Sequence, residues 1–201
     1  LLSGSVGTTI DSGSKVTDVR TGKFHSLLST TVLDGTAVTS ATLSILTVAD
    51  STAYTISYQK TPDTLAEGLI PVTITSGVGA TTASILAALA AEINTNHATA
   101  LTATVVNSTL VVSTLAYTSK VNMQVTANLN IGKVTKTNTV SCDDTGTVDI
   151  PANSVTRIAV PVLGWDSVTN PVSGIAGTDR ETDSELRARY KVAKFGDGAN
   201  L

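Results

Sequence analysis

An acidic turn, Asp143-Asp144-Thr145-Gly146-Thr147, holds the residues best suited to chemistry. One position separates it from Asp-Lys-Thr-Gly-Thr, a motif whose aspartate accepts a phosphoryl group. That reaction also needs a second lysine and a metal-binding acidic loop far along the chain, and few residues follow this turn. Within the turn, Asp144 occupies the position of the motif's own lysine. Because an Asx-type turn between two strands explains the same residues, we expect no catalytic residue and interpret the chain as a non-enzyme.

Metal and cofactor sites are not expected either. The two histidines, His25 and His97, are far apart, and neither has another histidine or a cysteine at the spacing of zinc ligands. Asp143, Asp144 and Asp149 do not follow the spacing of a calcium loop. Phosphate-loop, dinucleotide-binding and Gly-x-Ser-x-Gly patterns are absent from the sequence. The sequence therefore indicates neither a metal nor a cofactor.

The composition favours β-structure with one solvated face. Hydrophobic residues make up 41% of the 201 residues but aromatic residues only 3%, so Val, Ile, Leu and Ala alternate with many Ser and Thr. A net charge of −3 argues against a nucleic-acid surface. The apolar runs fall short of the roughly 18 residues that span a bilayer. The single cysteine, Cys142, has no partner for an internal disulfide. We therefore expect neither nucleic acid nor a membrane as a partner.

Residues 1–48 contain short apolar runs separated by turn signals, which predicts a β-meander with one packed face. The expected elements are a hairpin of strands 8–10 and 15–19 around a turn at 11–13, a strand over 24–33 and a strand over 36–48. We expect these strands to belong to a β-rich parent domain formed by residues 1–49 and 138–178.

Residues 50–137 are expected to form an inserted α+β domain of ββαβββ order. Alternating residues predict its strands, and an alanine-rich segment predicts one helix. The expected elements are strands 53–58 and 69–75, a helix over 83–94 capped by Thr81 or Thr82, and strands 101–106, 109–115 and 121–127. One helix face is apolar, and it must cover the sheet because neither element can bury its apolar side alone. The predicted fold class is therefore mainly β, of α+β type, with a capped C-terminal helix.

The segment around the only tryptophan is expected to form a structural joint. A strand over 155–163, apolar and apparently buried from residue 158 onward, leads to Trp165 in a polar turn. Pro171 excludes the helical region for Asn170, so the chain must turn or extend there. A loop with Gly177 follows. We expect Trp165 to be a packing anchor; an exposed sugar-binding platform is the alternative.

A capped, charged helix over 182–195 is predicted next, within a C-terminal segment at 179–201. Thr182 and Glu185 match a capping box. Asp183 with Arg187, and Glu185 with Arg189, are acid–base pairs one helical turn apart. The apolar stripe of this helix is narrow, which favours an exposed interface over a core helix. The candidate subunit interface consists of Leu186, Arg187, Arg189 and Tyr190.

Four segments carry a family resemblance. The segments 161–171, PVLGWDSVTNP, and 179–189, DRETDSELRAR, resemble the J-like baseplate wedge family of contractile phage tails. Residues 4–16 resemble the opening strand of that family, and residues 147–157 resemble its segment leading to the tryptophan. Together these segments cover 46 of the 201 residues, in the order that the family has.

The resemblance implies a structural subunit of a baseplate wedge. Such subunits form the ring around the central hub and couple host attachment to sheath contraction by rotating between two packed states. The implied partners are a second copy of the chain, other wedge subunits, the sheath initiator and hub-proximal proteins. The implied location is the virion tail baseplate, assembled in the host cytoplasm. The resemblance also implies a helical region before Leu1 and a second domain after Leu201.

A binding module is the alternative function: a β-rich adhesin or carbohydrate-binding domain of a tail fibre or cell surface. Strands rich in Ser and Thr suit such a module. The low aromatic content argues against it, because sugar sites usually need exposed rings.

Overall fold

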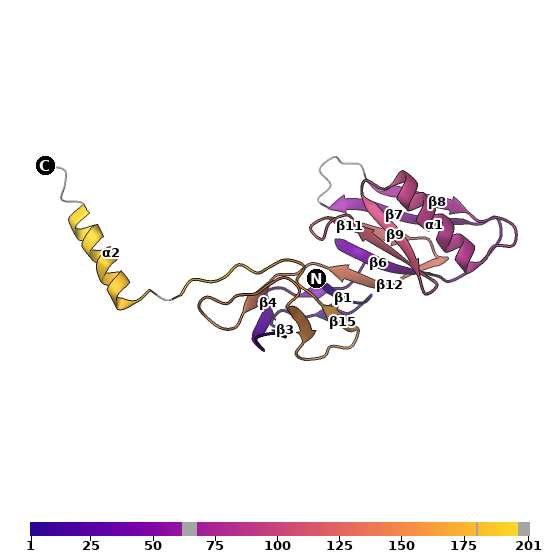
Figure 1. Ribbon diagram of the computed structural model, residues 1–201. Helices are drawn as coiled ribbons and strands as arrows, with labels where there is room; N and C mark the ends of the chain where they lie inside the picture. The colour runs from indigo at the N-terminus through magenta and orange to yellow at the C-terminus, as the bar shows by residue number, and fades with distance from the viewer. Residues whose placement is uncertain (62–67, 180, 197–201) are drawn as a thin grey trace.

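The computed structural model describes residues 1–61, 68–179 and 181–196, which form antiparallel sheets and two helices (Figure 1). The strands are β1 (Leu2–Ser5), β2 (Thr9–Ile10), β3 (Lys15–Asp18), β4 (Phe24–Leu27), β5 (Thr31–Val32), β6 (Val38–Ile45), β7 (Ala53–Thr61), β8 (Ile70–Thr75), β9 (Leu101–Val106), β10 (Thr109–Thr114), β11 (Lys120–Val125), β12 (Leu129–Lys136), β13 (Val140–Cys142), β14 (Val155–Ile158) and β15 (Trp165–Val168). The helices are α1 (Thr82–Asn96) and α2 (Asp183–Gly196). The predicted class, mainly β with α+β character and a C-terminal helix, is confirmed.

Nine strands form one large sheet, in the order β15-β1-β12-β6-β11-β7-β8, with β10 beside β6 and β9 beside β10. Its centre is β6, which pairs with β12 on one side and with β10 and the end of β11 on the other. The strands expected at 53–58, 69–75, 101–106, 109–115 and 121–127 correspond to β7, β8, β9, β10 and β11. Helix α1 packs against β8, β9 and β10 and covers one face of the sheet.

Helix α1 begins at a cap that the sequence predicts. The Thr81 side chain accepts the backbone N–H of Ser84, and the Ser84 hydroxyl accepts the N–H of Thr81, so two exposed amides are satisfied. The expected apolar face is fully buried and consists of Ile85, Leu86, Leu89 and Ile93. At the other end, Asn94 exchanges hydrogen bonds of 2.8 and 2.9 Å with the backbone of Ala103, which fastens α1 to β9.

Strand β12 is not predicted by the sequence pattern, yet it joins the two expected parts of the chain. Gly132 interrupts the alternation of side chains, and the ladder to β6 shifts register between Ile131 and Lys133. On its other side β12 pairs with β1. The large sheet thus combines strands from residues 1–49 and 138–178 with strands from residues 50–137. The division into a parent and an inserted domain stays a prediction.

The hairpin predicted near the N-terminus is wrong. β2 pairs with β5, whereas β3 pairs with β4 and β14. Between β2 and β3 the chain turns through Gly13, whose φ of 81° suits glycine and whose N–H donates to the Leu27 carbonyl. The two strands therefore enter different sheets. The single strand expected over 24–33 is also wrong, since it is divided into β4 and β5.

The second sheet has the order β13-β4-β3-β14 and meets the large sheet where β14 contacts β15. Its buried apolar side chains are Val16, Leu27 and Val155. Asp18 and His25 are buried with them, on the neighbouring strands β3 and β4. This small sheet therefore contains ionisable groups that are removed from solvent.

The strand expected over 155–163 is shorter than predicted, and its apolar end is not buried. β14 ends at Ile158. Leu163 is 100% exposed and Val160 is 64% exposed, whereas Ile158 and Val162 are partly buried against the core. Trp165 does not lie in a polar turn, because it opens β15, which pairs with β1. A hydrophobic run alone does not reveal whether any sheet lies against it.

Candidate functional site

Trp165 is buried at the edge of the large sheet. Its side chain is 5% exposed and belongs to the hydrophobic core, and its Nε1 donates a hydrogen bond of 3.0 Å to the Ser167 carbonyl. Its strand partner is Gly4, where a Cβ would collide with the carbonyl oxygen of Gly164. The missing side chain at Gly4 thus lets the chain before Trp165 approach β1 closely. Trp165 has the position of a packing anchor and not that of an exposed platform.

Asn170 connects three segments through its side chain and backbone. Its Oδ1 accepts the N–H of Val155 at 2.8 Å, and its Nδ2 donates to the carbonyls of Pro151 at 2.7 Å and Val172 at 3.0 Å. Its own carbonyl accepts the N–H of Asn153 at 2.6 Å. The side-chain amide therefore fixes the start of β14, the turn before it and the chain that leaves β15.

Pro171 lies between the two sheets. It lines a largely apolar cavity of about 190 Å³, whose other walls include Leu2 of β1, Val168 of β15 and Val155 of β14. Proline has no backbone N–H, so Pro171 needs no hydrogen-bond acceptor at this position between the two sheets. Asn170 and Pro171 together direct the chain out of the large sheet and across the small one.

The chain beyond the joint, residues 171–179, runs along the loop at 146–153, and we call this segment the strap. The N–H of Gly174 donates to the Ile150 carbonyl at 2.7 Å. The Ser173 hydroxyl accepts the N–H of Ala152 at 3.3 Å. A Cβ at Gly177 would lie 2.7 Å from the carbonyl oxygen of Gly146, so this close approach of two backbones requires glycine. The expected joint residue Gly177 is thus a point of backbone contact.

Asp179 fastens the end of the strap. Its Oδ1 accepts the backbone N–H of Thr147 at 2.8 Å, and the Thr147 hydroxyl lies 2.7 Å from the same carboxylate. The hydrogen bond from the Thr147 backbone and that from its hydroxyl hold the pKa of Asp179 below its usual value. Gly146, beside Thr147, has a φ of 95°, and a Cβ there would lie 2.9 Å from Asp179 Oδ1. We call the contact between Thr147 and Asp179 the latch.

The acidic turn before the latch makes structural ion pairs. Asp143 contacts Lys15 Nζ at 2.8 Å and accepts the Ser26 hydroxyl at 2.6 Å. Hydrogen bonds from Lys15 and Ser26 lower the pKa of Asp143. Asp144 contacts Lys23 at 3.1 Å. Asp143 thus fastens the turn to β3 and β4, and Asp144 fastens it to the segment between these two strands. The expectation that the turn is not catalytic stays a prediction.

The histidines are separated in space as well as in sequence. Neither ring nitrogen of His25 has a hydrogen-bond partner among the described residues, and the same is true of Asp18 Oδ2 nearby. His97 follows α1, and its Nδ1 lies 3.2 Å from the Tyr58 hydroxyl. In the described part of the chain, no three His, Cys, Asp or Glu side chains converge as metal ligands.

Helix α2 has the expected capping box but only one of its two expected ion pairs. Arg187 contacts Asp183 at 2.7 Å. Arg189 contacts Glu181 at 2.9 Å, so the predicted pair with Glu185 is wrong. The reason is competition: the Glu185 carboxylate accepts the N–H and the hydroxyl of Thr182, each at 2.8 Å. These two hydrogen bonds also lower the pKa of Glu185. Both arginines thus form ion pairs with carboxylates that precede them in the sequence.

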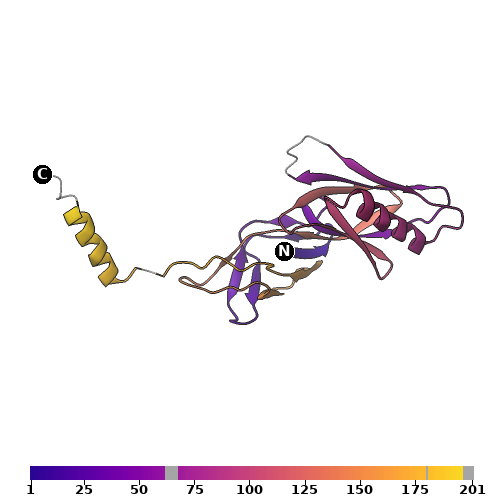
Figure 2. The ribbon, with the colours of Figure 1, turned by 45° about the horizontal axis from the view of Figure 1, so that its top comes forward.

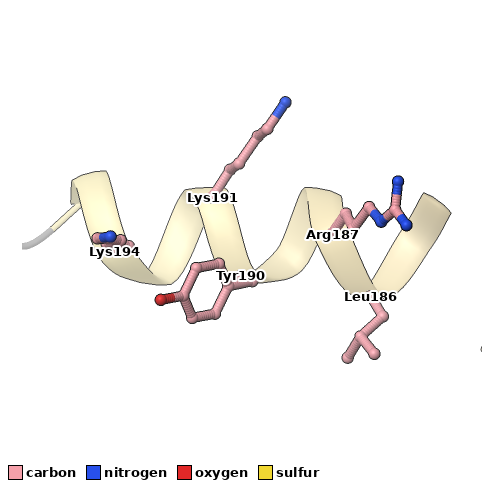
Figure 3. Close-up of a pocket in the computed structure, with 5 residues that line it drawn as sticks. All are labelled: Leu186, Arg187, Tyr190, Lys191 and Lys194. Atoms are coloured by element: carbon pink, nitrogen blue, oxygen red, sulfur yellow. The ribbon is translucent and has the colours of Figure 1, made fainter. Parts of the chain in front are cut away.

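The apolar stripe of α2 is uncovered. Leu186 is 47% exposed and Tyr190 is 63% exposed, and all described side chains of the helix face solvent. Figure 3 shows these two side chains on one side of the helix, with Lys191 directed away from them. A shallow apolar groove is lined by Leu186, Arg187, Tyr190, Lys191 and Lys194. In Figures 1 and 2 the helix stands clear of both sheets. It presents a small apolar surface with cations beside it.

Sequence reasoning missed the latch and the side-chain network of Asn170. The signal for Asn170 was present, since an Asn before Pro that follows a strand offers an amide to the backbone of the turn. Thr147 and Asp179 gave no signal, because nothing in either stretch indicates that the two lie together.

No family model, curated protein or solved structure matches this chain. Among the described residues, neither helix is long and apolar enough to cross a membrane. The described residues thus form a two-sheet body, a fastened strap and an exposed helix.

Proposed function

We propose that this chain is a structural subunit of a contractile phage tail baseplate wedge. It would contribute to the ring around the central hub and help to couple host attachment to sheath contraction. Its partners would be a second copy of itself, other wedge subunits, the sheath initiator and proteins near the hub, within the tail baseplate of the virion. No cofactor is needed, because the function is mechanical.

The order of the segments supports this proposal. The stretch with Trp165, Asn170 and Pro171 and the charged stretch after Asp179 resemble the J-like wedge family, as do the opening strand and residues 147–157. These segments have structural roles in the fold: β1 pairs with β15, and residues 147–153 carry the strap. The resemblance therefore includes residues that build the joint and the first turns of α2.

One observation carries the proposal: α2 is an amphipathic helix that nothing in the described part of the chain covers. Leu186 and Tyr190 are exposed beside Arg187 and Arg189, whose charges have partners within the same helical segment. A helix that satisfies its own charges and leaves its apolar stripe open suits docking into a partner. We assign Leu186, Arg187, Arg189 and Tyr190 to the subunit interface.

Reversing the two arginines tests the interface. The double substitution Arg187→Glu and Arg189→Glu places like charges beside Asp183 and Glu181 and against an acidic partner. Exposed ion pairs contribute less than about 1 kcal/mol each, so the melting temperature of the isolated chain should change little. Assembly of the full-length protein with its co-expressed tail partners should fail, since an unpaired charge at an interface costs several kcal/mol. Native gels report the assembly.

The matched control reverses two arginines on the body, Arg20→Glu and Arg157→Glu, which should leave assembly intact. A large drop in melting temperature of the α2 variant with normal assembly would assign the helix to the fold of this chain. Equal loss of assembly in both double variants would show that net charge, and not this interface, is responsible.

A second candidate function, carbohydrate binding, is favoured by a row of hydroxyls on the solvent face of the large sheet. The row crosses neighbouring strands in register and consists of Ser167, Ser3, Thr135, Ser40, Ser113 and Thr102. Thr135 Oγ1 lies 3.2 Å from Ser3 Oγ, and Ser113 Oγ lies 3.1 Å from Ser40 Oγ. Tyr117, 40% exposed, lines the same hollow. Hydroxyls beside a ring are the chemistry that neutral sugars meet in proteins.

A glycan array with the isolated chain tests this candidate. Binding that Tyr117→Ala abolishes, and that Tyr190→Ala on α2 leaves unchanged, would favour it. Absence of binding to every glycan, together with successful wedge assembly, would support the structural role and not carbohydrate binding.

A further inference from the structure

The strap is held unequally along its length. At its root, the Asn170 side chain makes three hydrogen bonds to backbone groups, and both Asn170 and Pro171 are partly buried. From residue 172 to residue 179 every side chain is exposed, and Ile175 is 98% exposed. The root is thus part of the body, whereas the outer strap lies on its surface.

The outer strap depends on few attachments. Near the root, Asn170 Nδ2 donates to the Val172 carbonyl and the Ser173 hydroxyl accepts the N–H of Ala152. Farther out, the attachments are the bond from the Gly174 N–H to the Ile150 carbonyl, the backbone contact of Gly177 with Gly146, and the latch between Thr147 and Asp179. No side chain of residues 172–179 enters the core. Exposed hydrogen bonds exchange readily for hydrogen bonds to water, so their net contribution to holding the strap is small. The strap therefore has little apolar burial to make its detachment costly: Val172, at its inner end, is 47% exposed and lines the cavity between the sheets, and Ile175 is exposed.

We propose that the outer strap, residues 172–179, is releasable: the latch between Thr147 and Asp179 holds it down, and it pivots at Asn170 and Pro171 when the latch opens. In the latched state the end of the strap has a fixed place on the body, and α2 begins four residues beyond Asp179. In the released state α2 moves on a tether. The device itself does not depend on the identity of any partner; its use during assembly rests on the proposed function.

Release of the latch would let the end of the strap move around the pivot. An extended residue spans about 3.4 Å, so a freed segment over 172–179 reaches up to about 27 Å from the pivot. Helix α2 carries its own capping box at Thr182 and Glu185, so its first turn needs no contact with the body. Release therefore changes the position of the helix without requiring the helix to unfold.

Distances between two spin labels test the strap. Cys142→Ser removes the native thiol, and Asp11→Cys on the body with Ala188→Cys on α2 provides two exposed label sites. In this background we expect one narrow distance distribution from electron–electron double resonance. Asp179→Ala, and separately Thr147→Val, should broaden it over a range of up to about 27 Å. Gly177→Val should act in the same way, because its side chain would meet the Gly146 carbonyl.

The control is Asp149→Ala, another exposed aspartate of the same loop, whose ion pair with Arg20 is outside the strap. It should keep the narrow distribution, and the melting temperature of all variants should match that of the labelled parent. The proposal is overturned if the parent is already as broad as Asp179→Ala, if Asp179→Ala stays narrow, or if Asp149→Ala broadens equally. These measurements use the chain without partners, so a failure of wedge assembly would not affect them.

Discussion

Trp165 is the residue whose loss should be most costly. Its side chain is 5% exposed, and it is the only tryptophan. Trp165→Ala should lower the free energy of unfolding by about 3–5 kcal/mol, the usual result of emptying an aromatic core site. Chemical denaturation followed by circular dichroism measures the change. The native protein should also have a blue-shifted fluorescence maximum.

Leu163 provides the control for Trp165, since it precedes the same strand but is 100% exposed. Leu163→Ala should change the free energy of unfolding by less than about 0.5 kcal/mol. Comparable losses at both positions would contradict the assignment of Trp165 as the anchor of the joint.

His25 should make the stability of the small sheet depend on pH. Burial lowers the pKa of His25; the carboxylates of Asp18, Asp143 and Asp144 oppose this shift, and Lys23 adds to it. The unfolded chain has a His25 pKa near 6.5, so below that pH it takes up a proton before the folded chain does. The contribution of neutral His25 is complete above about pH 6.5 and is lost as the pH falls toward the lower folded pKa.

Urea midpoints at pH 7.0, 6.0 and 5.0 measure this dependence. They should fall with decreasing pH in the native chain and fall less steeply in His25→Leu, which has no proton to bind. Asp18 stays ionised across this range: burial raises its pKa, but hydrogen bonds from the Arg20 backbone and from Thr21 outweigh burial and lower it. If the urea midpoints of the native chain and of His25→Leu fell equally with decreasing pH, His25 would not be the titrating group.

Among the helices and strands, the sequence predicts features that depend on residues close together in the chain. The cap of α1 at Thr81 and the cap of α2 at Thr182 depend on residues three positions apart, and both are confirmed. The pairing of β2 with β5 depends on contacts between distant segments, and the Asp11-Ser12-Gly13 turn signal predicts a different pairing. The Glu185–Arg189 pair failed because the cap competes for the same carboxylate. Spacing rules do not say which of two local partners is preferred.

Strand β6 should decide whether the middle of the chain folds independently. It pairs with β10, β11 and β12, so a fragment without β6 lacks the strand that connects them. We expect a fragment of residues 37–136 to give a dispersed amide NMR spectrum. A fragment of residues 51–137, the inserted domain without β6, should give a poorly dispersed spectrum, because three strands would lose a hydrogen-bonded neighbour.

These two fragments distinguish between alternative boundaries of the middle unit. Dispersed spectra from both would support an insertion that begins near residue 50 and would show that β6 is dispensable. A poorly dispersed spectrum from residues 37–136 would mean that β1 and β15 are also needed to complete the sheet.

For the whole molecule, the sequence predicted the mainly β class, the helix of the middle unit and the exposed C-terminal helix. It did not predict one sheet that runs through both expected domains, because that sheet depends on β12, where Gly132 interrupts the pattern. Nor did it predict the course of the strap, whose contacts at Gly146 and Asp179 join residues distant in sequence. The exposure of α2 could be predicted from its own narrow apolar stripe, whereas the strap has no sequence pattern of its own, and the assignment of α2 to a subunit interface stays a prediction.

Asn170 also determines how tension would travel through the molecule. A pull on α2 along the strap is first resisted by the latch and then by Asn170. Its side chain is bonded to Pro151 and Val155 beside the small sheet, and its neighbour Thr169 donates its N–H to Leu1 next to β1 of the large sheet. The pulling force is therefore shared by the hydrogen bonds of both sheets before it reaches the pairing of β15 with β1. Trp165, at the other end of β15, would be among the last residues of that strand to be pulled away.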